Sequence, residues 1–421
     1  MTATDSKHDA GQGGLHYGWA IVAVVFLAQA LVIGASLYGF ALLVKPIAAE
    51  FDLTRADANA GLMLLLVGMA IVSPFIGRAL DRLPGRLLIA GGALIFGLGC
   101  GIIAFSPSLW TMAAATLLPL AVGVQVLGPL GANALTARWF RRDRGRALGI
   151  VAVASSTGGL LVLPLMTMFV ERLGWRGAVA IMGGLVVILM VPLALLVIRE
   201  PPPVPSGTEV SGASPSSGVP ARLWSMRELL QVRDFWLLVL CVGPILGVNQ
   251  SLLASLVAYG TDQGYSLKAA SLVVSVVSGS AIIGKLIIGE LSDHVDMRWL
   301  LLAVVMLGEA YLACLILTPG YTILLLVSLL AGAAIGGVMP LWAAFISQRF
   351  GAASFGTIMG LMIPMQIALT LLCLYISGHS YDVSGSYEAA FSIFAGVLVV
   401  SALAVLPVGI RREDGVRPEA P

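Results

Sequence analysis

The amino-acid sequence predicts an all-α integral membrane protein with twelve transmembrane helices in two similar six-helix halves. Of the 421 residues, 58% are hydrophobic and 11% are charged, whereas a soluble globular protein carries about 25% charged residues. The mean hydropathy is +0.97. Apolar runs of about 20 residues recur along the whole chain, and each can cross a hydrocarbon core of roughly 30 Å. Such a chain belongs in a lipid bilayer.

Twelve apolar runs predict the spans. They are α-helical, because a spanning β-strand needs only about 10 residues and alternates in polarity. The predicted spans are 18–44, 58–77, 87–105, 109–137, 146–170, 176–198, 235–259, 269–289, 299–317, 321–347, 354–378 and 387–410.

The first half begins after a polar tail, residues 1–17, and covers 18–198. Its first apolar run is too long for the core of a signal peptide, so we expect no cleavage. The second run ends at "GRALDR", and a basic stretch, "RWFRRDRGR", separates the fourth run from the fifth. These polar stretches set the turns between the spans.

A polar linker, residues 199–234, separates the halves, because its Pro, Ser and Gly residues cannot bury enough apolar surface to fold alone. The second half covers 235–410, and a polar tail, 411–421, follows it. "GELSDH" in the second half lies 212 residues after "GRALDR" in the first. A repeat of half the chain length predicts two related halves.

The distribution of Lys and Arg predicts the orientation. With the N-terminus in the cytoplasm, 18 of the 24 basic residues fall in cytoplasmic loops and tails, four in outer loops and two in spans. The positive-inside rule therefore places both termini in the cytoplasm. We expect the protein to lie in the plasma (inner) membrane and to work as a monomer.

Several function classes find no support in the sequence. No in-span nucleophile and base, metal-ligand cluster or Walker loop is present, so we expect no enzyme, no metal, no cofactor and no ATP-driven pump. The basic cluster is explained by topology rather than by nucleic-acid binding. The four cysteines are Cys100, Cys241, Cys314 and Cys373, and all lie in predicted spans, so we expect packing rather than disulfides.

The stretch from Gly77 to Arg86, "GRALDRLPGR", resembles the signature that follows the second helix in the major facilitator superfamily. Gly77, Asp81, Arg82 and Arg86 match it. Ala79 and Pro84 depart from the usual leucine and glycine. The resemblance implies that fold and alternating access.

The second copy of the signature keeps Gly289 and Asp293, with His294 at the basic position. An Asp and an Arg at these helix ends can pair and then separate when the halves rock. We therefore expect a gating motif at Gly77, Asp81, Arg82, Gly289 and Asp293.

Three further stretches resemble the monocarboxylate transporter and oxalate/formate antiporter branch of that superfamily. They are "YGWAIVAVVFL" with "SLYGFALLVKPIAAEF", "RWFRRDRGRALGIVAVASSTGG", and the basic residue four positions before Gly289. The basic position is usually an arginine that binds the substrate carboxylate in that family. Here it is Lys285, which keeps the charge but loses the two-pronged geometry of a guanidinium group.

Charged residues within or at the edge of the spans mark candidate substrate or ion pathways, because each costs about 2.5 to 3.5 kcal/mol to insert. On a helical wheel, Lys285 shares the small, polar face of the span 269–289 with Ser278, Ala281 and Gly289. We expect this lysine to bind an anion. The alternative is that its stem reaches the cytoplasmic interface, about 6 Å away.

Lys45 shares a helix face with Tyr38 and matches a lysine of the same branch, so both are candidate substrate-binding residues. An interfacial anchor and a cation that attracts anions explain Lys45 equally well. Glu309 has two interpretations, a structural or lipid-interface role and a proton carrier. Proton-coupled relatives carry an aspartate where this chain has Ala281, which leaves proton symport, anion exchange and facilitated diffusion open.

Two polar residues complete the predicted substrate site. Asn249 follows a helix-breaking Gly and Pro pair in the span 235–259, and Gln366 lies in the span 354–378. Interhelical hydrogen bonding is the simpler role for each. Overall, the sequence predicts a secondary transporter of a small organic anion, with monocarboxylates favoured and protons as one candidate coupling ion. The alternative is a larger or uncharged solute, such as a vitamin, aromatic compound or drug.

Overall fold

The computed structural model describes residues 6–53, 55–140, 143–200, 224–317 and 320–405. Most of the predicted linker, the end of the last predicted span and the C-terminal tail lie outside these residues. Every regular element in the described part is helical. Eleven helical stretches are long and apolar enough to cross a membrane. The prediction of an all-α membrane protein is confirmed.

The first half holds twelve helical segments, several of which join end to end into one span. Three of them are short π-helices, labelled η1 to η3. The segments are α1 Ser6–Ile33, η1 Gly34–Tyr38, α2 Phe40–Glu50, α3 Arg55–Arg82, α4 Gly85–Phe105, α5 Leu109–Ala115, η2 Thr116–Leu120, α6 Ala121–Leu127, α7 Pro129–Trp139, α8 Arg144–Thr157, η3 Gly158–Val162 and α9 Leu163–Val197.

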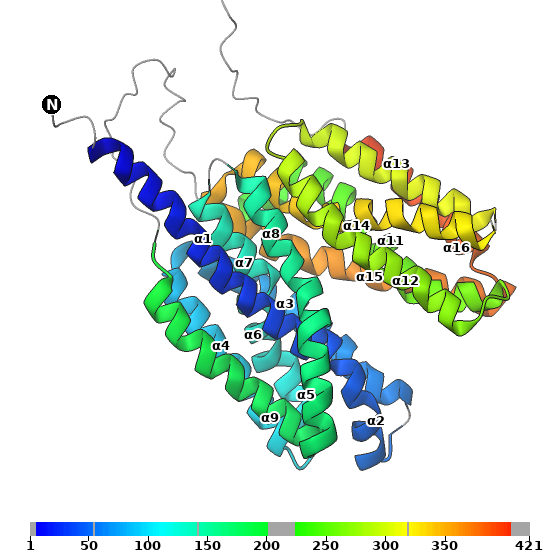
Figure 1. The fold of residues 1–421 in the computed structure, drawn as a ribbon, viewed down its shortest axis with the longest axis horizontal. Helices are drawn as coiled ribbons and strands as arrows, with labels where there is room; N and C mark the ends of the chain where they lie inside the picture. Colours follow the sequence, from blue (N-terminus) through cyan, green and yellow to red (C-terminus); the bar gives the residue numbers. More distant parts are fainter. Residues whose placement is uncertain (1–5, 54, 141–142, 201–223, 318–319, 406–421) are drawn as a thin grey trace, which may run out of the picture.

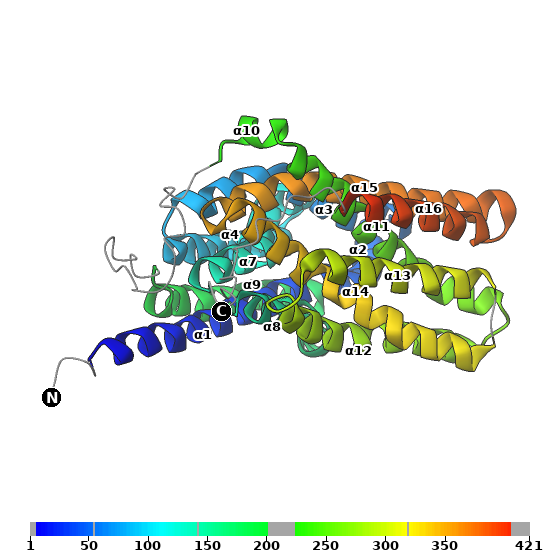
Figure 2. The same cartoon turned by 90° about the horizontal axis from the view of Figure 1, so that it is seen from above.

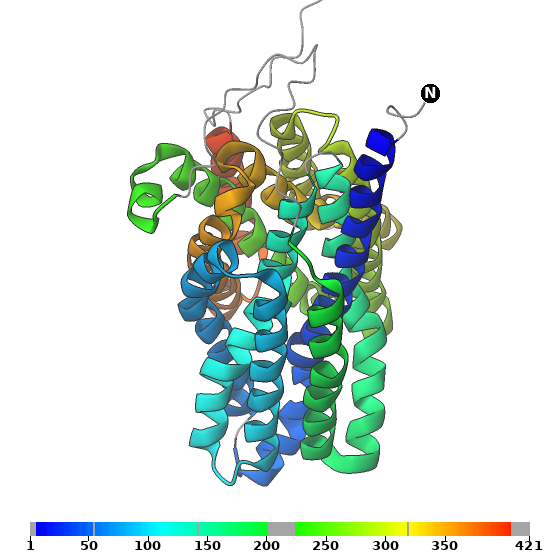
Figure 3. The same ribbon diagram turned by 90° about the vertical axis from the view of Figure 1, so that its left-hand side faces the viewer.

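The longest apolar stretch, 144–197, contains two of the predicted spans rather than one. Gly174 inside it has φ 72° and ψ 170°, a backbone conformation that glycine adopts without a steric penalty. Figure 3 shows the chain reversing direction there, so that the two arms run side by side. With this stretch counted as two, the eleven apolar stretches give the twelve crossings that the sequence predicts.

The second half is built of longer, less interrupted helices. A short helix, α10, precedes it and lies outside the bundle (Figure 2). The segments are α10 Met226–Gln231, α11 Arg233–Asp262, α12 Leu267–Leu291, α13 Met297–Ile316, α14 Tyr321–Phe350, η4 Ala352–Ser354, α15 Phe355–Ser384 and α16 Glu388–Val405.

The two six-helix bundles meet mainly where α3 packs on α15 and α8 packs on α12. Figure 1 shows them converging at one end of the molecule and diverging toward the other. We call the first end, where α3 and α12 finish and α8 and α15 begin, the closed end. The opposite end, which holds Gly174, is the open end.

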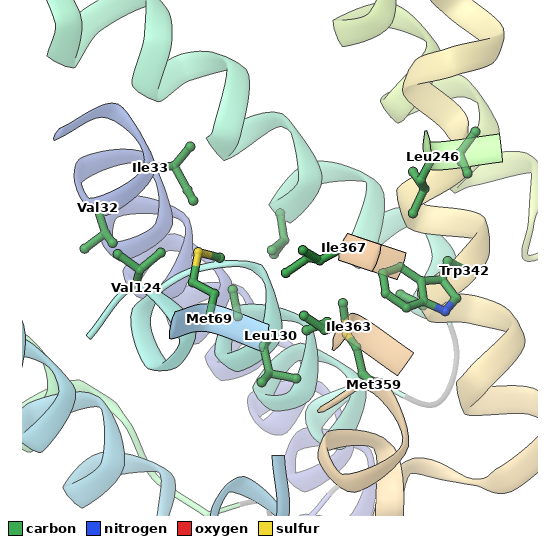
Figure 4. Packing of buried hydrophobic residues seen from close by; sticks show 14 of the residues in the cluster. Val32, Ile33, Met69, Val124, Leu130, Leu246, Trp342, Met359, Ile363 and Ile367 are labelled. Carbon is green, nitrogen blue, oxygen red and sulfur yellow. The ribbon is translucent and has the colours of Figure 1, made fainter. Parts of the chain in front are cut away.

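A continuous apolar core links the halves. Ile363 and Ile367 of α15 lie between Met69 and Leu130 of the first half and Trp342 of the second (Figure 4). All five side chains are buried. Dense packing of this kind excludes water and polar solutes from the place where these five side chains meet.

The π-helical turns of the first half bring two spans into close contact. A Cβ atom on Gly34 of η1 would lie 2.4 Å from the Cβ of Val162 in η3. One on Gly158 of η3 would lie 2.4 Å from the Ala30 carbonyl oxygen. Because π turns are frequent at functional sites, this crossing indicates where the first half is adapted for function.

Candidate functional site

The carboxylate of Asp81, at the end of α3, caps a helix in the opposite half. Its two oxygens accept hydrogen bonds from the backbone N–H groups of Gly356 (2.9 Å) and Thr357 (2.6 Å), in the first turn of α15. The first N–H groups of a helix have no partner within it, and the helix dipole favours a negative charge there. Asp81 thus joins the halves at the closed end.

Asp293, just after α12, makes the same contact in the reverse direction. It accepts hydrogen bonds from the backbone N–H groups of Gly145 (2.7 Å) and Arg146 (3.0 Å), in the first turn of α8. An exposed ion pair between Arg146 and Glu290 (3.4 Å) lies beside it. The repeated sequence therefore builds two equivalent caps, one in each direction across the halves.

Glycines let the helix backbones approach at both caps. A Cβ atom on Gly77 would lie 2.0 Å from the Gly356 carbonyl oxygen, and one on Gly289 would lie 2.8 Å from the Gly145 carbonyl oxygen. The hydroxyl of Ser73 donates to the Gly360 carbonyl oxygen at 2.9 Å. The role of Gly77 and Gly289 is close packing, which a side chain would prevent.

The arginine of the signature does not pair as the sequence suggested. Arg82 is exposed, and none of the described carboxylates forms an ion pair with it. Arg138 of α7 takes the position nearer Asp81: its guanidinium donates to the Leu80 carbonyl oxygen and lies 4.0 Å from Glu200. The reason is that Asp81 points at the start of α15 rather than along the surface.

Removing the charge of one cap should loosen only the helix start that it holds. We expect Asp81→Asn to raise amide hydrogen exchange at Gly356 and Thr357 by about 5- to 30-fold, because a charged helix cap contributes about 1 to 2 kcal/mol. Exchange at Gly145 and Arg146 should change little. Asp293→Asn should give the reverse pattern. Equal exchange in all three proteins would contradict the capping role.

Lys285 also bridges the halves, one turn above Gly289. Its ammonium group donates to the hydroxyls of Ser155 (3.1 Å) and Ser156 (2.7 Å) of α8. No described carboxylate lies within ion-pair distance of it. The Ser155 hydroxyl donates in turn to the Ala152 carbonyl oxygen at 2.9 Å. A half-buried cation is thus held by neutral oxygen atoms alone.

The direction of the Lys285 side chain tests the alternative that its stem reaches the interface at the closed end. The backbone of Lys285 lies against Gly149, since a Cβ there would be 2.6 Å from the Lys285 carbonyl oxygen. Ser155 is six residues further along α8, about 9 Å toward the open end. The ammonium group therefore points away from the closed-end interface and toward the region between the halves.

Tyr38 extends this site toward the open end. Its side chain is 43% exposed, and a Cβ on Gly159 would lie 3.2 Å from its ring. Gly159 is one helical turn beyond Ser155. Lys285, Ser155 and Tyr38 therefore follow one face of α8 and η3. Lys45 lies further out on α2, where it is exposed.

The two predicted amide residues lie apart from this line. Asn249 of α11 is only 8% exposed, and its Nδ2 atom has no hydrogen-bond partner within the described part of the chain. Gln366 of α15 donates to the Thr370 hydroxyl of its own helix at 3.0 Å. The structure does not bring either of them to Lys285 through a hydrogen bond.

Some residues of the site were not among the predicted ones. Ser155 and Ser156 stand out in the sequence only as part of "ASSTGG". Elsewhere in the described chain, Gln29 of α1 and Glu309 of α13 each have a buried side-chain oxygen without a hydrogen-bond partner among the described residues. A buried polar atom of this kind cannot be recognised from residue type alone, because it depends on the neighbouring helices.

Comparisons with known proteins agree on one family. Residues 24–369 match the family described as "Major Facilitator Superfamily". The chain is 26% identical over 412 residues to "Monocarboxylate transporter 13" of Rattus norvegicus, covering 93% of this chain and 88% of that one. It is 23% identical over 377 residues to "Uncharacterized MFS-type transporter YcxA" of Bacillus subtilis (strain 168), covering 86% and 88%.

Solved structures of the same superfamily share the fold. The proton:xylose symporter XylE, bound to 6-bromo-6-deoxy-D-glucose, aligns with a TM-score of 0.71 at 17% identity, over 94% of this chain and 96% of that one. The transporter FucP, in the outward conformation, aligns with a TM-score of 0.67 at 16% identity, over 92% and 98%. At these identities the likeness concerns the fold.

Proposed function

The chain belongs to the Major Facilitator Superfamily, and from this premise we propose that it transports a small organic anion, with monocarboxylates favoured, by alternating access. Membership makes it a transmembrane transporter and not an enzyme.

The observation that carries the proposal is the uncompensated charge of Lys285. Its ammonium group lies between the halves and touches only the hydroxyls of Ser155 and Ser156. A partly buried cation without a counter-ion is costly, and a carboxylate would offer it a stronger, charge-assisted hydrogen bond than a neutral hydroxyl does. An anion arriving from the open end would therefore displace the hydroxyls.

Tyr38 and Lys45 fit this route. Both lie on the open-end side of Lys285, and both are exposed. Lys45 would raise the local concentration of anions before they bind. Tyr38, with a phenol group beside the polar face of η3, would contact the organic part of the cargo.

The closed end is assigned to the cytoplasm. Many arginines gather there, as the positive-inside rule requires of a cytoplasmic face. They include Arg78, Arg82, Arg86, Arg138, Arg144, Arg146, Arg298 and Arg349. The structure then represents the outward-facing state in the plasma membrane. The Asp81 and Asp293 caps would hold it, and they would have to open for release into the cytoplasm.

The names of several relatives support an anionic cargo. Besides monocarboxylate transporter 13, the chain is 26% identical over 298 residues to "Monocarboxylate transporter 12" of Rattus norvegicus, covering 65% of this chain and 61% of that one. Transport would be driven by symport with a proton or by exchange for another anion. Ala281, one turn from Lys285, supplies no carboxylate for coupling.

Counterflow in proteoliposomes tests the cargo class. We expect short labelled monocarboxylates to accumulate against an internal pool of the same anion, because exchange through a carrier needs no other driving force. An imposed pH gradient should raise accumulation if a proton is coupled and leave it unchanged in exchange. Uncharged solutes of the same size serve as the control. Uptake of these solutes without uptake of any anion would favour the alternative of a neutral cargo.

A further inference from the structure

The first half contains a cavity whose chemistry is opposite to that of the Lys285 site. It has a volume of about 270 Å³ and lies within the six-helix bundle, in its open-end part. All six spans of the half contribute to it. The walls include Phe40, Leu65, Phe96, Cys100, Met112, Met166 and Met182. None of the lining residues whose side chains the structure describes is charged.

The few polar atoms of this cavity are already occupied. The Ser36 hydroxyl donates to the Val32 carbonyl oxygen at 2.6 Å, and the Thr116 hydroxyl donates to the Met112 carbonyl oxygen at 2.9 Å. A carboxylate placed here would lose its hydration, and the described lining offers it no cation and only the weak donor of the Cys100 thiol. The cavity therefore discriminates against the anions that the Lys285 site favours.

We propose that this cavity is a binding site for a small, uncharged apolar molecule with one ring or two fused rings. An apolar cavity of about 150 Å³ can hold benzene, so about 270 Å³ has room for a bicyclic compound. Three of the lining residues are methionines, whose flexible side chains adapt to ligands of different shape. Filling the space restores the packing contacts that the walls lack.

The site is connected to transport through the first span. Ala35 and Ser36 of η1 and Phe40 and Leu43 of α2 form one wall of the cavity. Tyr38, which lies between Ser36 and Phe40 in the sequence, packs against Gly159 of η3 and not against the cavity. A bound apolar molecule would hold this segment in its present place. Inhibition should follow without competition for the Lys285 site, because the two sites are separate.

Binding can be measured without any transport. In lipid nanodiscs, we expect 1-fluoronaphthalene to give a saturable, shifted ¹⁹F signal with wild-type protein. The signal should fall at least tenfold in Ala113→Phe, which fills the cavity from one wall, and in Leu64→Phe, which fills it from another. Ala114→Phe is the matched control, since Ala114 is the next residue of α5, is exposed and does not line the cavity. An excess of 1-naphthoate should not displace the probe.

Equal signals in Ala113→Phe, Leu64→Phe and Ala114→Phe would overturn the proposal, because they would mean partition into lipid only. Displacement by 1-naphthoate would overturn it as well, since it would show that the site accepts a charge. Gel filtration and circular dichroism would confirm that each variant is folded. The ¹⁹F signal does not depend on anion transport. A negative result for the cavity would therefore not contradict the proposed anion transport, and the reverse also holds.

Discussion

Anion uptake should fall by about 100-fold in Lys285→Gln, while Lys285→Arg should keep part of the activity. A hydrogen bond to a charged group contributes about 1.5 to 3 kcal/mol, and tenfold in affinity corresponds to about 1.4 kcal/mol. Glutamine is one methylene shorter than lysine and keeps an N–H donor, but it removes the charge. Arginine restores the charge in a flatter, larger group.

Initial rates of counterflow at several anion concentrations would measure this effect. Lys268→Gln is the matched control, because Lys268 lies in the same helix, α12, and is exposed at the open end. It should retain nearly normal uptake. Full activity of Lys285→Gln, with normal amounts of folded protein in the vesicles, would show that the charge is not needed.

A leucine at Gly77 should prevent the closed end from closing. The Cβ atom alone would lie 2.0 Å from the Gly356 carbonyl oxygen, and the atom in the way is backbone. Overpacking of a well-packed core costs about 1 to 3 kcal/mol, and about 2.7 kcal/mol already changes a two-state ratio 100-fold. The state with the closed end shut should therefore be depleted, and the proposed transport cycle, which must pass through that state, should be lost.

Spin labels at Lys45 and Lys268, both exposed at the open end, would report the change by double electron–electron resonance. With the four native cysteines replaced by alanine, we expect shorter distances between the labels in Gly77→Leu than in its parent. Gly289→Leu, at the equivalent contact, should behave in the same way. Gly91→Leu is the control, since nothing lies within 4 Å of a Cβ at that glycine. An unchanged distance distribution in Gly77→Leu would contradict the model of a glycine-dependent closure.

Much of the fold follows from the sequence, because lipid leaves the chain few choices. Runs of apolar residues must become helices, and the polar stretches between them must reach water. The stretch 144–197 holds two predicted spans, and the turn between them is made at Gly174, inside the segment α9. A single glycine suffices for that turn, and its φ value cannot be read from composition.

The site was predicted less completely. Asp81, Asp293, Gly77 and Gly289 were identified as a gating motif, but their partners are backbone groups of α15 and α8. Every residue except proline carries a backbone N–H group, so the residue type does not reveal which N–H groups bind the carboxylates. The helical wheel placed Lys285 on a polar face, yet the depth of its ammonium group depends on how α12 lies against α8, which requires the packed bundle.

The two aspartate caps have a consequence for assembly. Each half supplies one carboxylate and one helix start, and each carboxylate caps the helix start of the other half. The repeated motif therefore makes the halves complementary as well as similar. The same four hydrogen bonds that keep one end shut also fix how far one bundle can slide along the other. The hydrogen bonds of the two caps therefore have two results. They pair the halves correctly as the chain folds, and they set the order of opening during transport.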